Sequence, residues 1–284
     1  RCSGFNADKF SGKGVSDDIW ATLYAYYWEL WIGERITSIL VDLQKNNVIA
    51  DFNESDFIND VLKLFSKQKK KIKTLTELSD YFLHLQKDVE YEIQNFIFQG
   101  KQTPVVEILL PIAKLSYEYP ALLKEKIPFF KDKYILYLID ELENFSASQQ
   151  QLIQTLLREK PAACTFRVGT RPYGIRTYKT LGEVEENHDG SEFEKIILDD
   201  FLRELKEEDY EKYITEICER RLQNSNFILY KDFKIEEFIE DQTNEDTIAK
   251  VYKKKETQSR SYMHRLRKNL ENLKNIHLLE KDID

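Results

Sequence analysis

The sequence predicts an α/β protein in which a parallel, doubly wound sheet is followed by a helical region. Three apolar runs have the length of buried strands: 134–139 (YILYLI), 164–169 (CTFRVG) and 193–198 (FEKIIL). Helical patterns separate these runs, and strands that alternate with helices form parallel sheets. Because the first run is continuously apolar, we expect that strand to be buried on both faces.

Three helices are predicted before the first strand. Apolar residues recur at steps of three and four from Ile19 to Ile36, with Asp17 or Asp18 as the cap. The aromatic residues of this stretch are typical of a core-facing stripe, although exposed aromatics would also suit base stacking. Two further helices are predicted over 52–73 and over 75–98, the second with Thr76 as its cap, and the run 105–110 fits either a strand or the start of a helix.

Polar side chains follow the first two strands at the point where each ends. Asp140 and Glu141 come directly after the first strand, and Thr170 and Arg171 follow the second. Ligands of open α/β sheets bind at the carboxyl ends of the strands, so these four residues are candidates for a site. The alternative is a strand end that simply meets solvent, with Arg171 on a turn stiffened by Pro172.

An amphipathic helix is expected between these two strands. Ser146 can cap it, and one face carries Leu152, Ile153, Leu156 and Leu157.

This order of strand, acidic pair, helix, strand and Thr-Arg resembles the Walker B and sensor 1 halves of AAA+ or STAND-type P-loop NTPases. The Asp-Glu-Leu-Glu sequence at 140–143 is most similar to origin-recognition-like bacterial AAA ATPases. The resemblance implies ATP and Mg²⁺ as cofactors, with Asp140 at the metal and Glu141 as the catalytic residue that orients the attacking water. It also implies that Thr170 contacts the nucleotide and that Arg171 acts catalytically as a γ-phosphate sensor.

The phosphate-binding half of such an enzyme is missing from the sequence. No GxxxxGK[ST] motif occurs, and the nearest stretch, 11–14 (SGKG), has Gly14 where Ser or Thr is required. We expect residues 1–202 to form a P-loop NTPase core that lacks Walker A and is incomplete at its N-terminus. Residues 203–284 are expected to form a helical lid and the start of a C-terminal helical region.

Two explanations for the missing motif remain open. In the first, Walker A lies upstream of Arg1, and the protein is an ATPase when complete, whereas this sequence alone is inactive. In the second, the domain is degenerate and no longer binds nucleotide.

Composition limits the other function classes. The net charge of −8 and the pI near 5.3 argue against a global attraction to nucleic acid. Three scattered cysteines fit neither a disulfide framework nor a zinc site, and no run is long and apolar enough to span a membrane, so we expect a cytoplasmic location. No Asn-Lys-x-Asp motif for guanine is present, which makes ATP the expected nucleotide.

The leading hypothesis is therefore a Mg²⁺-dependent ATPase switch that acts on a DNA or protein partner and can form homo-oligomers, with no membrane involvement. The alternative is a non-hydrolysing interaction or nucleic-acid-binding domain that uses the basic segment 250–274. This segment contains nine Lys and Arg residues and only two Glu. A nuclease built on paired acids is a weaker third class, because no further acid or Lys is seen to converge on Asp140.

Overall fold

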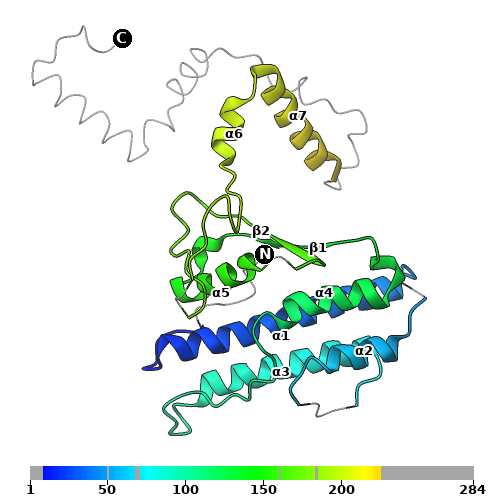
Figure 1. The fold of residues 1–284 in the computed structure, drawn as a ribbon, viewed down its shortest axis with the longest axis vertical. Helices are drawn as coiled ribbons and strands as arrows, with labels where there is room; N and C mark the ends of the chain where they lie inside the picture. The colour runs from blue at the N-terminus through cyan, green and yellow to red at the C-terminus, as the bar shows by residue number, and fades with distance from the viewer. Residues whose placement is uncertain (1–8, 50, 68–70, 160, 183–184, 225–284) are drawn as a thin grey trace, which may run out of the picture. The chain divides into compact units, whose positions relative to one another are not determined.

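The computed structural model describes residues 9–49, 51–67, 71–159, 161–182 and 185–224 (Figure 1). The chain divides into two compact units, 1–195 and 196–284, and each is considered by itself. The first unit is a layered arrangement of helices with a small parallel sheet, and the second contains two described helices.

The longest helix, α1 (Asp17–Lys45), is the centre of the first unit and packs against α3 (Leu75–Asn95), α4 (Lys114–Lys126) and α5 (Ala147–Arg158). Its aromatic residues are buried, Trp20, Tyr24 and Trp28 among them, which confirms the core-facing interpretation over base stacking. Gly33 makes the approach of α3 close: a Cβ there would lie 2.7 Å from the Phe82 ring. The expected cap is wrong, because Ser16 takes that position and Asp17 and Asp18 lie in the first turn.

Two shorter helices, α2 (Glu54–Leu62) and α4, pack with α1 and α3 in the first unit. The segment α2 ends well before residue 73, so the predicted helix over 52–73 is correct only in its first half. Thr74, and not Thr76, caps α3 by accepting a hydrogen bond from the Glu77 amide at 3.2 Å. Residues 105–110 form neither a strand nor a helix but a connection that leads into α4 (Lys114–Lys126).

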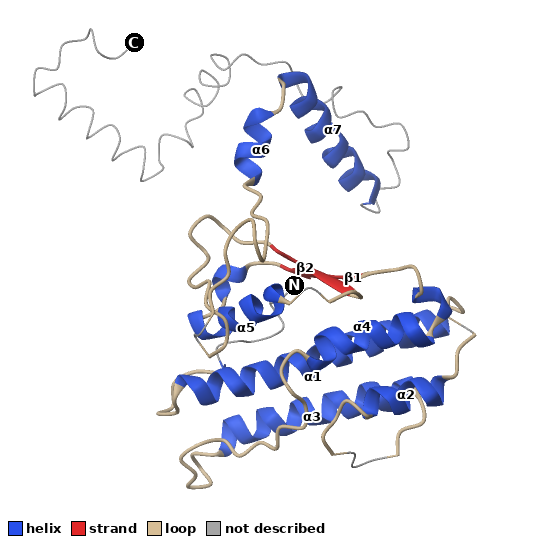
Figure 2. Ribbon diagram, in the orientation of Figure 1, coloured by secondary structure: helices blue, strands red, loops and turns tan. Residues whose placement is uncertain are grey.

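The described sheet consists of two parallel strands, β1 (Ile135–Ile139) and β2 (Cys164–Val168), in the register Ile135 to Cys164 through Ile139 to Val168 (Figure 2). They are joined through the 3₁₀ turn Leu142–Asn144 and α5 (Ala147–Arg158). Ser146 caps α5 in a full capping box with Gln149, as the sequence predicts. This mixed helix and strand content is compatible with an α/β fold of the P-loop type.

Two expectations about strands are wrong. Alternate residues of β1 are exposed, with Leu138 72% and Leu136 43% accessible, so in the described chain this strand is buried on one face only. The segment 193–198 is not a strand: Phe193 forms one isolated bridge with Asp189, and its carbonyl accepts from the Gly190 amide at 2.8 Å, whereas residues 194–197 have no regular secondary structure. Leu198 already begins a helix.

The second unit contains α6 (Leu198–Glu204) and α7 (Glu207–Asn224). No residue of α6 is buried. The basic segment 250–274 lies outside the described residues.

Candidate functional site

The carboxyl ends of β1 and β2 lie side by side, so the two loops that follow them form one edge. We call residues 140–146 the β1 loop and residues 169–176 the β2 loop. The Gly169 amide donates to the Ile139 carbonyl at 2.7 Å, and the Leu142 amide donates to the Gly169 carbonyl at 3.1 Å. These two bonds continue the pairing past the last ladder residues. The structure therefore brings the two predicted residue pairs, Asp140 with Glu141 and Thr170 with Arg171, to the same edge of the sheet.

The acidic pair is exposed and conformationally constrained. The Glu141 amide donates to Oδ1 of Asp140 at 2.9 Å, and Glu141 itself adopts a left-handed conformation with φ of 59°. Such a conformation is costly for a residue with a side chain and is common at functional sites. Gly169 faces Asp140: a Cβ at this glycine would lie 3.1 Å from Oδ1, so a side chain here would press on the Asp140 carboxylate.

Glu143 connects the two loops, and the sequence analysis did not single it out. Its Oε2 accepts from the Thr170 hydroxyl at 3.2 Å and from the Arg171 amide at 3.3 Å, and its Oε1 lies 3.2 Å from Nε of Arg171. Hydrogen bonds from its own backbone amide and from that of Arg171 hold the pKa of the Glu143 carboxyl below its usual value. Its place in the sequence, two residues after Glu141, was the available signal.

Gln150 of α5 binds both loops through its side chain. The sequence patterns did not identify it as a site residue. Its side chain is fully buried; Nε2 donates to the carbonyls of Leu142 and Gly174, each at 3.0 Å, and Oε1 accepts from the Arg176 amide at 2.8 Å. A polar residue three positions before Ile153, on the apolar face of α5, could have shown this role. Three consecutive glutamines at 149–151 conceal it in the sequence.

A buried carboxylate anchors the sheet to the helices. Glu29 of α1 accepts from the amides of Leu115 and Ser116, at 2.6 and 2.9 Å, and from the Ser116 hydroxyl at 2.7 Å. The Ser116 carbonyl in turn accepts from the Tyr137 hydroxyl of β1 at 2.9 Å and from the Cys164 thiol of β2 at 3.5 Å. Both strands are therefore tied to the first turn of α4.

The electrostatics of this anchor follow from its burial. Burial raises the pKa of Glu29 to about 7, although the hydrogen bonds from Ser116 and Leu115 act in the opposite direction. Burial also raises the pKa of the Cys164 thiol to about 11, so this cysteine is in its unreactive, protonated form at neutral pH. The anchor is thus a structural feature beneath the site.

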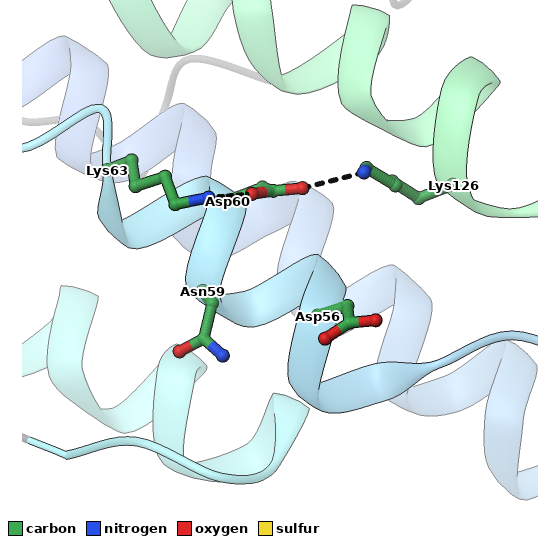
Figure 3. Close-up of a pocket in the computed structure, with 5 residues that line it drawn as sticks. All are labelled: Asp56, Asn59, Asp60, Lys63 and Lys126. Carbon is green, nitrogen blue, oxygen red and sulfur yellow. Dashed lines mark hydrogen bonds and ion pairs between the residues drawn. The ribbon is translucent and has the colours of Figure 1, made fainter.

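A separate hollow of about 440 Å³ lies on the first unit, between α2, from Asp56 to Lys63 just past its end, and Lys126 at the end of α4 (Figure 3). Asp60 sits between two cations, 2.6 Å from Lys63 and 2.8 Å from Lys126, and the hydrogen bond from Lys126 lowers the pKa of its carboxyl. Asp56 and Asn59 complete the lining. We interpret this hollow as a surface ion-pair cluster, since its central carboxylate is already engaged by two lysines.

No three His, Cys, Asp or Glu side chains in the described part of the chain converge as a ready-made metal site. A magnesium ion held by one or two carboxylates together with nucleotide phosphates does not need such a cluster. Asp140 is an exposed carboxylate at a strand end and fits that smaller role. A search of the described helices finds none with the length and apolarity needed to cross a membrane.

Comparison with known proteins defines the class first: the chain is related to the AAA+ proteins, whose general function is nucleotide binding of the ATPase type. It belongs to the ORC-CDC6-like family, whose model matches residues 1–283. No curated protein matches the chain, and no solved structure matches it.

Proposed function

We propose that this protein is a Mg²⁺-dependent ATP-binding and ATP-hydrolysing switch in which the edge formed by the β1 and β2 loops faces the terminal phosphate. The observation that carries this proposal is the adjacency of the two loops. In a member of the ORC-CDC6-like family, two neighbouring parallel strands end in an acidic pair and in Thr-Arg, and two hydrogen bonds lock those ends together.

The four residues take distinct roles. Asp140 supplies a carboxylate to Mg²⁺, and Glu141 orients and activates the attacking water. Thr170 contacts the nucleotide beside the terminal phosphate, and the Arg171 guanidinium, 84% exposed, stabilises the charge that develops there. The chemistry that Mg²⁺ would supply when bound there is stabilisation of negative charge on the phosphate.

We further propose that 1–202 is the nucleotide-binding core and that 203–284 includes a helical lid. A lid that responds to the terminal phosphate converts ATP binding into a change of conformation, which is the usual output of such switches. We also propose that the switch acts on a DNA or protein partner and that the protein can form homo-oligomers.

The test is hydrolysis by the intact natural protein, including whatever residues its gene encodes before Arg1. We expect Glu141→Gln to lower the hydrolysis rate at least about a hundredfold, the scale of general base catalysis, with ATP affinity unchanged within about threefold. Glu194→Gln, in the turn region before the second unit, is the control and should keep the wild-type rate.

The opposite results support the other hypothesis. Duplex DNA binding that falls steeply with salt and needs no ATP, in a protein with no hydrolysis, would mean a non-hydrolysing nucleic-acid-binding domain.

A further inference from the structure

The carboxylate of Glu143 makes three contacts that all reach the first two residues after Gly169. It accepts from the Thr170 hydroxyl and from the Arg171 amide, and it pairs with Nε of Arg171. The Glu143 side chain is only 20% exposed, whereas the Arg171 side chain is 84% exposed. The anchored partner is therefore the glutamate, and the arginine is the group that reaches solvent.

The rest of the β2 loop is fixed by other residues. Gln150 binds the Gly174 carbonyl and the Arg176 amide, and Nη2 of Arg176 donates to the Glu143 carbonyl at 3.0 Å. Gly174 has no room for a side chain, because a Cβ there would lie 2.9 Å from Cβ of Glu143 and would overlap the Thr170 hydroxyl. The loop is thus held at its far end by Gln150, and Glu143 is the β1-loop side chain that holds Thr170 and Arg171.

The Arg171 guanidinium retains a surface that an anion can reach. An exposed ion pair contributes little to folding, so stability is a poor reason for this arrangement. A guanidinium has five N–H donors in a rigid fork, and a carboxylate at Nε fixes the plane of that fork. The outer edge of the fork can then meet an incoming phosphate with little loss of side-chain entropy.

We infer that Glu143 is a positioning residue that orients Arg171 toward the terminal phosphate of a nucleoside triphosphate and holds Thr170 beside it. This inference rests on the proposed function, since it assigns a role to Glu143 within the same site. Its consequence concerns discrimination: Glu143 increases the preference for ATP over ADP and has little effect on the nucleotide features that the two share.

The first measurement is equilibrium binding of Mg·ATP and Mg·ADP to the intact protein. We expect Glu143→Gln to reduce the ratio of ATP to ADP affinity about tenfold, within the usual range of coupling between groups in one network, and to leave ADP affinity within about twofold. Arg171→Gln should give a similar loss. The double variant should lose little more than either single variant, because both act through the same contact.

Glu192→Gln is a closely matched control. The Glu192 carboxylate also accepts from a backbone amide and a hydroxyl, those of His188 at 2.8 Å and Ser191 at 3.2 Å, and it lies 3.6 Å from Arg158. This network belongs to neither the β1 loop nor the β2 loop. A general effect of removing a networked carboxylate would appear in both variants, whereas a positioning effect appears only at Glu143.

A second measurement needs no nucleotide. Amide hydrogen exchange of Arg171 should be about tenfold faster in Glu143→Ala than in wild type, since the amide loses its acceptor, and it should be unchanged in Glu192→Gln. Unchanged exchange in Glu143→Ala would overturn the inference. The inference would also be overturned if Glu143→Gln kept the wild-type ratio of ATP to ADP affinity. In that case the proposed function would still stand. A wild type that binds no Mg·ATP would instead overturn the proposed function, and this inference with it.

Discussion

Gln150 shows how one buried polar residue can organise two loops. Its side-chain amide donates to the carbonyls of Leu142, Phe145 and Gly174 and accepts from the Arg176 amide, and all four partners belong to the β1 and β2 loops. Buried backbone groups need partners, because an unpaired one costs roughly 1–3 kcal/mol. The side chain therefore stabilises both the core and the geometry of the candidate site.

Replacing Gln150 by Leu keeps the volume similar and removes all four bonds. We expect the free energy of unfolding to fall by at least about 2 kcal/mol, because the freed backbone groups stay buried. Urea titration measures this loss. Gln94→Leu, at an exposed glutamine of α3, is the control and should change stability by less than about 0.5 kcal/mol. Equal effects in the two variants would contradict the account of Gln150.

Glu29 gives the pH dependence of stability a specific source. Its pKa is raised from 4.5 to about 7 by burial, so between these values the folded protein binds more protons than the unfolded chain. The contribution of Glu29 to stability is therefore full below about pH 4.5 and is lost as the pH rises through about 7. The size of that loss is on the order of 3 kcal/mol.

We expect Glu29→Gln, which cannot titrate, to flatten the fall in stability between about pH 5 and pH 8. Unfolding free energies measured at several pH values for wild type and variant give the difference directly. Glu118→Gln, which removes an exposed carboxylate that pairs with Lys114 on α4, should keep the wild-type slope. The idea fails if the Glu29 variant and wild type lose stability in parallel.

At the scale of elements, the contact between α1 and α3 depends on Gly33. Alanine would favour the helix by about 1 kcal/mol, but its Cβ would lie 2.7 Å from the Phe82 ring and 3.0 Å from Leu115. We expect overpacking to win, with a net loss of about 1–2 kcal/mol.

A double variant tests the cause of that loss. Combined with Phe82→Leu, Gly33→Ala should cost less than it does alone, because the smaller side chain relieves the contact. Thermal or urea unfolding of the single and double variants measures the coupling. Additive losses would mean that the ring contact is not the cause.

The sequence predicts the helices and strands that have a clear period or a sharp boundary. The stripe from Ile19 to Ile36, the Ser146 cap and the two apolar runs before Asp140 and Thr170 all correspond to described elements. The strand predicted over 193–198 was wrong because Phe193 forms only an isolated bridge with Asp189 and Leu198 already begins α6, which apolar content does not reveal. The exposed face of β1 was missed because we took its continuous apolar run as evidence of two buried faces. The run itself does not show whether other elements cover both faces.

Some residues of the candidate site can be predicted from the sequence, and others cannot. A residue directly after a strand, such as Asp140 or Arg171, can be placed at a sheet edge from the chain order alone. Glu143 and Gln150 act through contacts between segments about 25 residues apart in sequence. Neither periodicity nor spacing encodes such contacts, and the described coordinates supply them.

At the scale of the whole molecule, the ORC-CDC6-like family and the arrangement of the two loops lead to one account. The first unit carries the edge that we propose faces the terminal phosphate, and the second begins with helices α6 and α7. A switch of this kind needs ATP and ADP to be distinguished at the edge before any partner can respond.

The most direct test of the central claim is Mg²⁺-dependent ATP binding by the intact natural protein, measured by calorimetry with and without Mg²⁺, for wild type and Asp140→Asn. The account predicts that Mg²⁺ strengthens wild-type ATP binding and that Asp140→Asn reduces this gain about tenfold or more, because one carboxylate ligand is lost. Absence of ATP binding in wild type, or a Mg²⁺ effect that Asp140→Asn leaves unchanged, would contradict it.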